Sequence, residues 1–347
     1  MRRFVERIWF GDDGVARLAR TVLAPSAALY AAASAVRNRL YGAGLLRSES
    51  LALPAISVGN LSVGGTGKTP VAAWLAGELA RRGFRPAVVL RGYGDDEPEV
   101  HATLNPGAIV VANPDRIAGT AAAAARGADV VVLDDAFQHR RARRDLDLVL
   151  VSADRWPARV RALPVGPFRE TLGALRRASM VIVTRKAASV HAAEAVAGAI
   201  AAAAPGVPVG RVHLAPAALV DARSGARTAL TALTGQPVLA ICGVGDPAAF
   251  ATQLAGAGAR VTLRAFPDHH PFSDAEISAL AAEASGMGGR AVCTLKDAVK
   301  LARRWPGDGP ALSYVSQQVI LEVGRDALDR LLDSALHARG PAAAAAG

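Results

Sequence analysis

The segment from Ser57 to Pro70, SVGNLSVGGTGKTP, constrains the fold more than any other part of the sequence. It continues an apolar stretch, ALPAISVGN, that predicts a strand, and it runs into KTPVAAWLAGELARRG, which predicts a helix closed by Gly83. Glycines between a strand and a helix let backbone N–H groups surround phosphate oxygens, and the helix N-terminus adds partial positive charge. The order of elements indicates a phosphate-binding loop, although Ser62 replaces a glycine of the strict G-x-x-x-x-G-K-[ST] pattern.

This loop assigns the nucleotide-binding side chains. Lys68 would reach the β- and γ-phosphates, and the hydroxyl of Thr69 would bind Mg²⁺. The alternative is a glycine-rich turn that contains Lys-Thr by chance. From the roles of Lys68 and Thr69 we predict ATP and Mg²⁺ as cofactors. The predicted cradle consists of Ser62, Val63, Gly64, Gly65, Thr66, Gly67, Lys68 and Thr69.

An acidic strand end further along the chain supports this interpretation. The stretch DVVVLDD predicts an apolar strand that ends in Asp134 and Asp135. One of these carboxylates would bind Mg²⁺ directly or through water. Strands often end in acids, so the pattern gains weight only because it lies downstream of the phosphate loop.

Strands and helices alternate from about Pro54 onward, which predicts an α/β fold. We expect a P-loop NTPase-like, mainly parallel sheet flanked by helices, with a second, smaller α/β domain. In the smaller domain, Ser273 and Glu276 predict a capping box at the start of a helix. The predicted ranges are 1–50 for an N-terminal helical segment, 51–215 for the P-loop core, 216–335 for the smaller domain and 336–347 for a disordered tail.

Charge and composition limit the possible partners. A net charge of +10 favours an anionic partner. Aromatic residues make up only 5%, and no basic patch is interleaved with them, so nucleic acid is not expected. Cys242 and Cys293 lie in apolar runs and are expected to be core residues. No obligate protein partner is evident.

The N-terminal region contains an uncharged stretch from Thr21 to Val36 with arginines on both sides. It is short for a transmembrane span, and Pro25 interrupts it. Two interpretations stay open. The stretch is either a buried helix of the globular domain or an apolar helix with arginine edges that lies in a membrane interface.

The motifs narrow the class of P-loop protein. No Asn-Lys-x-Asp motif of a GTPase is present, and Val63 stands where partitioning-type ATPases have a lysine. Seven motifs follow one another in a fixed order: SVGNLSVGGTGKTP, RGYG, DEP, LDDAFQHR, LPVGPFRE, FPDHH and TLKDAVKL. Over about residues 40–305 they resemble the tetraacyldisaccharide 4′-kinase, or lipid A 4′-kinase, family.

The resemblance implies an ATP-dependent lipid kinase of lipid A biosynthesis. Such an enzyme transfers the γ-phosphate to the 4′-hydroxyl of tetraacyldisaccharide 1-phosphate, an anionic glycolipid. It would act at the cytoplasmic face of the bacterial inner membrane as a peripheral or monotopic protein. A nucleotide-driven switch or chaperone that acts on a protein, and a non-catalytic nucleotide-binding scaffold, are the alternatives.

By resemblance, the general base is Asp96 and its partner is His269. Asp95 is the alternative position for the base. Asp96 is favoured because Glu97 follows it directly. His270 is the alternative imidazole. Because Asp96 and His269 come from the two halves of the chain, we expect them to meet across a cleft between the domains. The resemblance also places Arg91, Gln138, His139, Arg169 and Glu170 in the active-site region.

Four further features carry expectations. Ala136 replaces a family glycine and would cost stability if that position has a positive φ. The family's longer insert between RGYG and DEP is almost absent. Lys296 and Asp297 are expected only to cap a helix. For the basic run Arg140, Arg141, Arg143 and Arg144 we expect a solvated face, with contact to lipid phosphate or the membrane surface as the alternative.

Overall fold

The computed structural model describes residues 2–92 and 96–337, and the tail predicted from residue 336 on lies almost wholly outside them. The chain divides into two compact units. The first unit comprises Met1–Gly92, Asn105–Val212 and Leu321–Gly347, and the second comprises Tyr93–Leu104 and His213–Ile320. The predicted ranges place residues 96–104 and 213–215 in the core and residues 321–335 in the smaller domain. Packing assigns each of these segments to the other unit.

The sheet of the first unit has the strand order β9-β8-β7-β2-β5-β3-β4. The pairs β2–β5, β2–β7, β3–β4, β3–β5 and β7–β8 are all parallel, which confirms the predicted class of fold. A short parallel pair, β1 (Glu49–Ser50) with β6 (Ala142–Arg143), lies apart from it. The strands of the large sheet are β2 (Ala55–Asn60), β3 (Pro86–Leu90), β4 (Ile109–Ala112), β5 (Val130–Asp134), β7 (Leu146–Ser152), β8 (Met180–Arg185) and β9 (Val209–Asp221).

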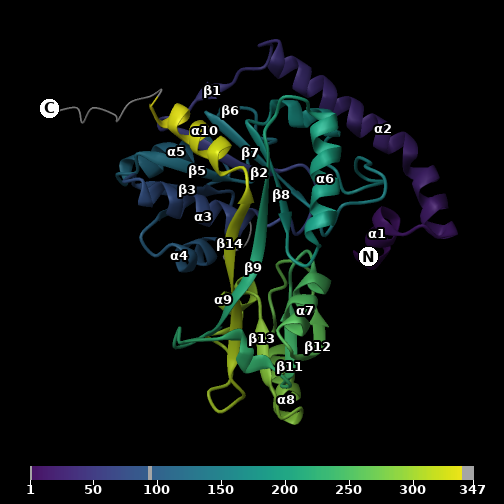
Figure 1. Cartoon of the computed structure of the whole chain (residues 1–347), viewed down its shortest axis with the longest axis vertical. Helices are drawn as coiled ribbons and strands as arrows, with labels where there is room; N and C mark the ends of the chain where they lie inside the picture. Colours follow the sequence, from purple (N-terminus) through teal and green to yellow (C-terminus); the bar gives the residue numbers. More distant parts are fainter. Residues whose placement is uncertain (1, 93–95, 338–347) are drawn as a thin grey trace. The chain divides into compact units, whose positions relative to one another are not determined.

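Helices bury this sheet, and its central strands β2, β3 and β5 are buried at every residue (Figure 1). Helix α5 packs on a cluster that includes Val89 and Leu133, and α6 packs on one that includes Val181 and Val183. Continuous Val/Ile/Leu runs are typical of parallel strands covered on both faces. The helices of this unit are α1 (Arg2–Phe10), α2 (Gly14–Gly42), α3 (Lys68–Arg81), α5 (Arg116–Ala125), η1 (Leu172–Arg177), α6 (Val190–Ala203) and α10 (Arg325–His337).

In the second unit, the strands of the large sheet follow the order β12-β11-β13-β14-β9, and β10 pairs with β9. Strand alternation divides its core: Leu239 and Ile241 pack with α8 and α9, whereas Val238 and Ala240 pack with α7. The predicted capping box of Ser273 is present at α8. The elements are α4 (Asp96–Leu104), β10 (Arg227–Thr228), η2 (Leu230–Leu233), β11 (Pro237–Cys242), α7 (Pro247–Gly256), β12 (Arg260–Ala265), α8 (Asp274–Gly286), β13 (Arg290–Cys293), α9 (Leu295–Leu301) and β14 (Leu312–Val323).

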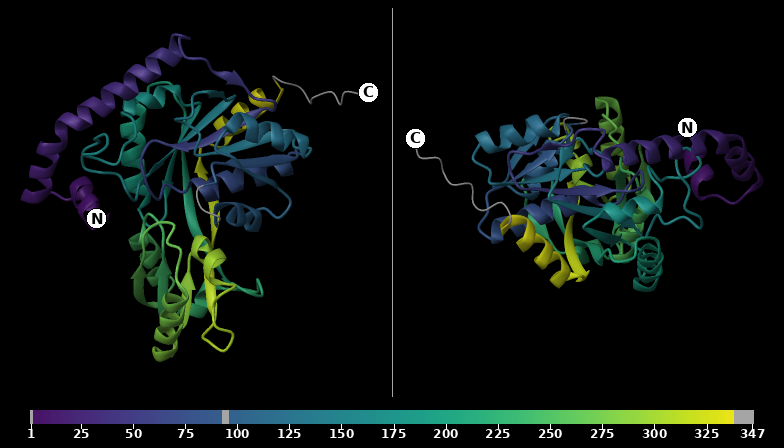
Figure 2. Two further views of the ribbon diagram at one scale, coloured as in Figure 1. Left: turned by 180° about the vertical axis from the view of Figure 1, so that it is seen from behind. Right: turned by 90° about the horizontal axis from the view of Figure 1, so that it is seen from above.

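Helix α2 is long and mostly solvent-exposed. It extends away from the sheet of the first unit, with α1 folded back beside its start (Figure 2). Arg20 fixes the turn between them by donating to the carbonyl oxygens of Ile8 and Gly11, both at 2.7 Å. Of its residues only Ala16 and Ala27 are buried, so the interpretation as a buried helix is wrong. Contrary to expectation, the helix also continues through Pro25.

One face of α2 is apolar. Val15, Leu18, Val22, Leu29 and Val36 are each between 47% and 73% exposed, and their spacing of three, four and seven residues places them in one stripe. Among the helices of the described residues, none combines the length and apolarity that crossing a membrane requires.

Candidate active site

The phosphate-binding loop lies between β2 and α3, where the sequence predicts it. Gly64 and Gly67 have φ values of +89° and +83°, a conformation that strains any other residue. Gly67 is the N-cap of α3, and among the described side chains none supplies a capping hydrogen bond there. The first turn of a helix has no intrahelical acceptors for its N–H groups, so this position suits a phosphate group.

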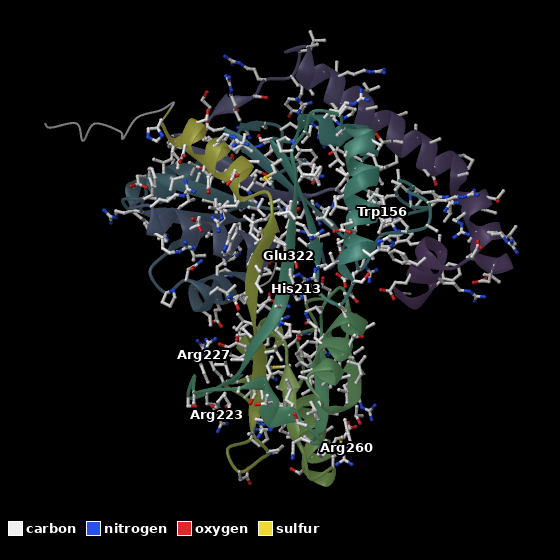
Figure 3. The ribbon with its side chains drawn as sticks, in the orientation of Figure 1. Trp156, His213, Arg223, Arg227, Arg260 and Glu322 are labelled. Carbon is white, nitrogen blue, oxygen red and sulfur yellow. The ribbon has the colours of Figure 1, made fainter. Side chains whose placement is uncertain are left out.

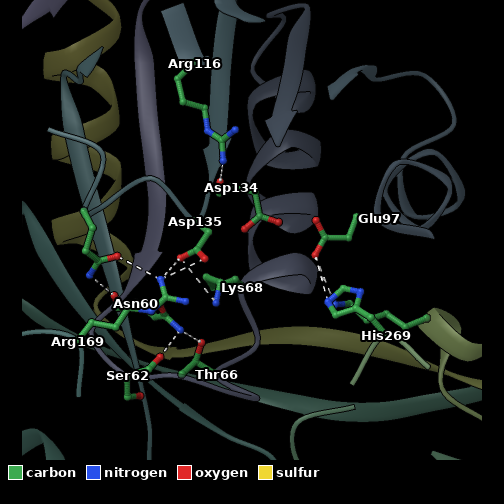
Figure 4. Close-up of polar contacts among 12 residues, drawn as sticks. Asn60, Ser62, Thr66, Lys68, Glu97, Arg116, Asp134, Asp135, Arg169 and His269 are labelled. Atoms are coloured by element: carbon green, nitrogen blue, oxygen red, sulfur yellow. Dashed lines mark hydrogen bonds and ion pairs between the residues drawn. The ribbon is translucent and has the colours of Figure 1, made fainter. Parts of the chain in front are cut away.

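Asn60, at the end of β2, holds this loop from within. Its amide Nδ2 donates to the carbonyl oxygen of Ser62 at 2.6 Å and lies 3.0 Å from Oγ1 of Thr66 (Figure 4). Asn60 is fully buried. Thr184 on β8 donates to the carbonyl oxygen of Thr66 at 2.9 Å, and Lys186 donates to that of Gly65 at 3.1 Å. These contacts fix the path of the loop.

The LPVGPFRE segment braces the loop from outside. The N–H of Val63 donates to the carbonyl oxygen of Pro167, and the N–H of Arg169 donates to that of Leu61, both at 2.8 Å. Trp156 packs edge-on against the buried ring of Phe168, with ring centroids 5.9 Å apart (Trp156 is labelled in Figure 3). This packing places the Arg169 side chain beside the phosphate loop.

Asp135 is the centre of a charged cluster next to the loop. Nη1 of Arg169 lies 3.0 Å from its Oδ1, and Nζ of Lys68 lies 3.8 Å from the same atom (Figure 4). Gln138 joins the cluster, since its Oε1 is 3.3 Å from Nη1 of Arg169 and its Nε2 donates to the carbonyl oxygen of Asn60. The structure therefore brings together four residues that the motifs had singled out, Lys68, Asp135, Gln138 and Arg169.

Asp135 also carries the backbone strain of this turn. Its φ is +53°, whereas Ala136 is absent from the residues with positive φ, so the cost expected at Ala136 does not arise. Non-glycine residues in this region concentrate at functional sites. The turn approaches β2 so closely that a Cβ on Gly59 would lie 2.4 Å from Cβ of Phe137. A glycine is therefore required at position 59.

The oxygen ligands here suit Mg²⁺. Hard cations of this kind take carboxylate and hydroxyl oxygens. Asp134 ends β5, and β5 pairs with β2 so that Asp134 lies opposite Val58, just before the loop. Asp134 is only 6% exposed, and its carbonyl oxygen accepts a 2.9 Å hydrogen bond from Arg116. Thr69 lies in the first turn of α3. The donor set of Thr69, Asp134 and Asp135 fits the ion chemically.

Two predicted residues, Glu170 and His139, have other surroundings. Glu170 is 3% exposed and accepts from Arg177 at 3.0 Å and from Asn38 on α2. It thus ties α2 to the body of the first unit. Burial lowers the pKa of His139, and the charges of Arg116 and Arg144 lower it further. His139 is therefore kept neutral.

The remaining arginines divide into exposed and anchored ones. Arg91 is exposed directly after β3. In the basic run, Arg141 pairs with Glu49 and Arg143 is exposed. Arg140 instead donates to the carbonyl oxygen of Asn38 at 2.7 Å, and Arg144 is 8% exposed and paired with Asp147. A solvated face is thus the wrong description for Arg140 and Arg144.

Asp96 and His269 lie together in the second unit. Nδ1 of His269 is 3.4 Å from Oδ1 of Asp96, and its Nε2 is 3.9 Å from Oε1 of Glu97 (the latter contact is drawn in Figure 4). Because α4, which begins at Asp96, packs on α9, both residues belong to this unit. The expectation that they meet across a cleft between domains is wrong. Asp95, the alternative base, lies outside the described residues.

The two histidines of FPDHH have different roles. His269 has a φ of +59°, and its ring lies beside Asp96, with Nδ1 3.4 Å from Oδ1. His270 stacks on Phe266 with centroids 4.9 Å apart, and its Nε2 lies 3.0 Å from Oε1 of Glu276. His270 therefore holds the loop in place, and the geometry favours His269 as the partner of Asp96.

Comparison with known proteins agrees with this geometry. A family model described as tetraacyldisaccharide-1-P 4′-kinase matches residues 19–337. The tetraacyldisaccharide 4′-kinase of Anaeromyxobacter sp. (strain Fw109-5) is 41% identical over 364 residues, which cover 97% of each chain.

The chain belongs to the tetraacyldisaccharide 4′-kinase family. The 4′-kinase of Geobacter metallireducens is 38% identical and covers 86% of this chain and 91% of its own. The crystal structure of LpxK from Aquifex aeolicus in complex with ATP superposes with a TM-score of 0.70 at 28% identity, covering 92% of this chain and 99% of that one. Family membership confirms the resemblance carried by the seven motifs and speaks against the switch ATPase.

Several residues of this 4′-kinase family member escaped the sequence reasoning. The motifs contain Asn60 and Lys300 but assign neither a role, and they do not include Arg116. Nζ of Lys300 lies 3.1 Å from Oδ2 of Asp96. The expectation that Lys296 and Asp297 only cap a helix is also wrong, because Nζ of Lys296 lies 3.6 Å from Oε1 of Glu97. The available signal in the sequence was the spacing of Lys296 and Lys300, four residues apart, which places them on one face of a helix.

Asp297 is a buried part of the same framework. It is fully buried and accepts hydrogen bonds from Oγ1 of Thr294 at 2.6 Å and from the N–H of Gly243 at 3.1 Å. Burial raises the pKa of its carboxyl. A Cβ on Gly243 would lie 2.7 Å from its Oδ1, so the glycine permits this close approach. Asp297 thereby anchors the start of α9.

Proposed function

We propose that this chain is an ATP-dependent lipid kinase that transfers the γ-phosphate to the 4′-hydroxyl of tetraacyldisaccharide 1-phosphate in lipid A biosynthesis. Family membership across residues 19–337 carries the proposal. The ATP-bound LpxK of Aquifex aeolicus supports ATP as the donor. The phosphate loop and the paired Asp96 and His269 supply the two kinds of chemistry that such a transfer needs.

The first unit would bind the nucleotide. The N–H groups of the loop and of α3 would hold the phosphates, and Lys68 would neutralise charge on the β- and γ-phosphates. Mg²⁺, held by Thr69 and the carboxylates of Asp134 and Asp135, would supply further positive charge at the phosphate oxygens. Arg169, now paired with Asp135, lies where a second cation can steady the charge of the transferring group.

The second unit would supply the base. A sugar hydroxyl is a weak nucleophile, and a carboxylate within hydrogen-bond reach accepts its proton as the bond to phosphorus forms. Asp96 is held by His269 on the Oδ1 side, and His269 in turn faces Glu97. Transfer would be direct, without a phosphoenzyme, because positioning and charge stabilisation perform most of the work in this chemistry.

The apolar stripe of α2 would hold the protein at the membrane. A helix with a continuous apolar stripe and basic flanks lies in the interface plane and is drawn to anionic lipid. On α2 the stripe from Val15 to Val36 is accompanied by exposed Arg17, Arg37 and Arg39. Peripheral or monotopic attachment at the cytoplasmic face, where ATP is available, follows for a substrate whose acyl chains stay in the bilayer.

A defined assay tests the function. The purified protein is incubated in detergent micelles with ATP, Mg²⁺ and tetraacyldisaccharide 1-phosphate, and the product is identified by mass spectrometry and ³¹P NMR. We expect a new phosphate on the 4′-hydroxyl, lost in Lys68→Ala and in Asp96→Asn. Lipid-independent hydrolysis of ATP without any 4′-phosphate would contradict the proposal and favour a nucleotide-driven switch.

A further inference from the structure

Lys300 lies against the carboxylate of the proposed base. It is in the last turn of α9, and its side chain is 15% exposed. Its Nζ is 3.1 Å from Oδ2 of Asp96 and 3.4 Å from the carbonyl oxygen of His270, to which it donates. It therefore links α4 to the FPDHH loop at the point where His269 approaches the other oxygen of the carboxylate.

The framework around this contact is rigid. Thr294 caps the start of α9, and Asp297 is buried beneath Gly243 one turn before Lys300. Ala298 and Leu301 pack in the core of the second unit. The direction of the Lys300 side chain is thus set by a helix that is anchored at its start and along one face.

The two oxygens of Asp96 have different neighbours. Oδ2 faces the ammonium group of Lys300, and Oδ1 faces the imidazole of His269. The other titratable groups on the three packed elements are Glu97, Glu99 and His101 on α4, Lys296 and Asp297 on α9, and Asp268 and His270 in the loop. Among the contacts that the structure gives for the Asp96 carboxylate, Lys300 contributes the permanent positive charge.

We propose that Lys300 is a positioning residue for the phosphoryl transfer, which fixes the Asp96 carboxylate through Oδ2 and keeps it ionised so that Oδ1 can take the proton of the acceptor hydroxyl. This inference rests on the proposed role of Asp96 as the base. It extends that role by naming the group that makes a buried carboxylate usable. The hydroxyl proton moves to Oδ1 while the hydroxyl oxygen forms its bond to the γ-phosphorus and ADP leaves.

Electrostatics support the arrangement. Asp96 is only 6% exposed, and burial by itself raises the pKa of a carboxyl. The charge of Lys300, followed by the charge of His269, offsets this effect and leaves the pKa of Asp96 below its usual range. Without Lys300 the burial effect remains, and the carboxyl is expected to be protonated at a higher pH.

The test compares kcat at saturating substrates from pH 4 to pH 9 for the wild type, Lys300→Met, Lys300→Arg and Asp96→Asn. We expect Lys300→Met to shift the acidic limb of the profile upward by about one pH unit or more. Its deficit should be largest at the acidic end of this range and should narrow as the pH rises. Lys300→Arg keeps the charge and is expected to restore the limb.

Arg303→Met is the matched control, because it removes a positive charge nearby from a side chain that is 83% exposed and pairs with Glu99. Its profile should coincide with that of the wild type. Thermal unfolding and ATP binding check that each variant is folded. Lys300→Gln, which keeps a donor without the charge, carries the same test if Lys300→Met is unstable.

A loss that is equal at every pH, or an unshifted limb in Lys300→Met, would overturn the role of Lys300 while Asp96→Asn remains inactive. Wild-type turnover in Asp96→Asn would instead overturn the proposed base, and the inference about Lys300 with it. The two failures are thus distinguishable in one set of measurements.

Discussion

Arg169 and Asp135 form an ion pair in which Nη1 of the arginine lies 3.0 Å and 3.2 Å from the two carboxylate oxygens. The aspartate has a strained backbone, and the arginine belongs to the segment that braces the phosphate loop. Such a pair orients a potential Mg²⁺ ligand and keeps a cation beside the phosphate site. Both partners are about one third exposed, so its value lies in orientation more than in stability.

Arg169→Ala is therefore expected to lower kcat by about 10- to 100-fold with little change in the stability of the first unit. Steady-state kinetics with varied ATP and thermal unfolding measure the two effects. Arg159, like Arg169, lies in the segment between β7 and β8, and it is exposed. Arg159→Ala is therefore the control and should behave as the wild type. A variant that loses stability but keeps its kcat would contradict the orienting role.

Lys68→Met should reduce turnover by ~100-fold or more, because the ammonium group contacts the phosphates most strongly as charge develops in transfer. Arg81→Ala, at the far end of the same helix and 63% exposed, is the matched control. Comparable activity in Lys68→Met and Arg81→Ala would show that the loop does not bind the transferring phosphates.

Gly59→Ala should destabilise the protein by ~2 kcal/mol or more, since the added methyl group would overlap Cβ of Phe137. Gly198→Ala on α6 has open space around it and should instead stabilise by about 0.5–1 kcal/mol. Urea unfolding of both variants gives the comparison. Equal stability of the two would mean that β2 can move away from Phe137.

Glu322, labelled in Figure 3, predicts a pH-dependent contribution to stability. Hydrogen bonds from Arg185 and Arg211 outweigh burial and lower the pKa of Glu322 from 4.5 to about 2. A carboxyl whose pKa is lowered in the folded state stabilises the protein when the pH is above the pKa of the unfolded state. This stabilisation is lost as the pH falls toward the pKa of the folded state. Glu322→Gln should therefore cost roughly 2 kcal/mol at pH 7, and less at pH 4.

Urea unfolding at the two pH values measures this difference. Glu194→Gln is the control, because Glu194 pairs with Arg211 from a position that is 57% exposed. A cost for Glu322→Gln that is the same at both pH values would contradict an electrostatic origin.

The double change Leu18→Glu and Val22→Glu should weaken binding to vesicles that contain phosphatidylglycerol by about tenfold or more. Each substitution removes apolar area that would enter the membrane and adds negative charge. Vesicle sedimentation measures the partition. Val190→Glu alters an apolar residue that is 41% exposed at the start of α6 and should leave binding unchanged. Unaltered binding of the double variant would show that α2 does not mediate binding to the membrane.

The phosphate loop was predictable because its determinants are local. Strand, glycines, lysine and helix follow one another within SVGNLSVGGTGKTP, and Gly64 and Gly67 adopt the positive φ that favours glycine. The alternating apolar strands likewise predicted a parallel sheet. In these segments the sequence pattern and the tertiary structure agree.

The surroundings of Asp96 were not predictable from the residues alone. Its acidic segment predicts a solvated loop, whereas packing of α4 on α9 buries it beside Lys300. The burial of Arg144 and the contact of Glu170 with Asn38 also depend on partners far away in the chain. Periodicity carries no signal for such pairs, and the motif resemblance named Asp96 and His269 without naming what holds them.

The assignment of α4 to the second unit has a consequence for biosynthesis. Asp96 emerges from the ribosome about two hundred residues before Lys300, and the core of the second unit lies almost entirely downstream of it. At a translation rate of about 5–20 residues per second, α4 waits roughly 10–40 s for the surface that will bury it. Folding of the first unit can therefore begin before α4 has the surface on which it finally packs.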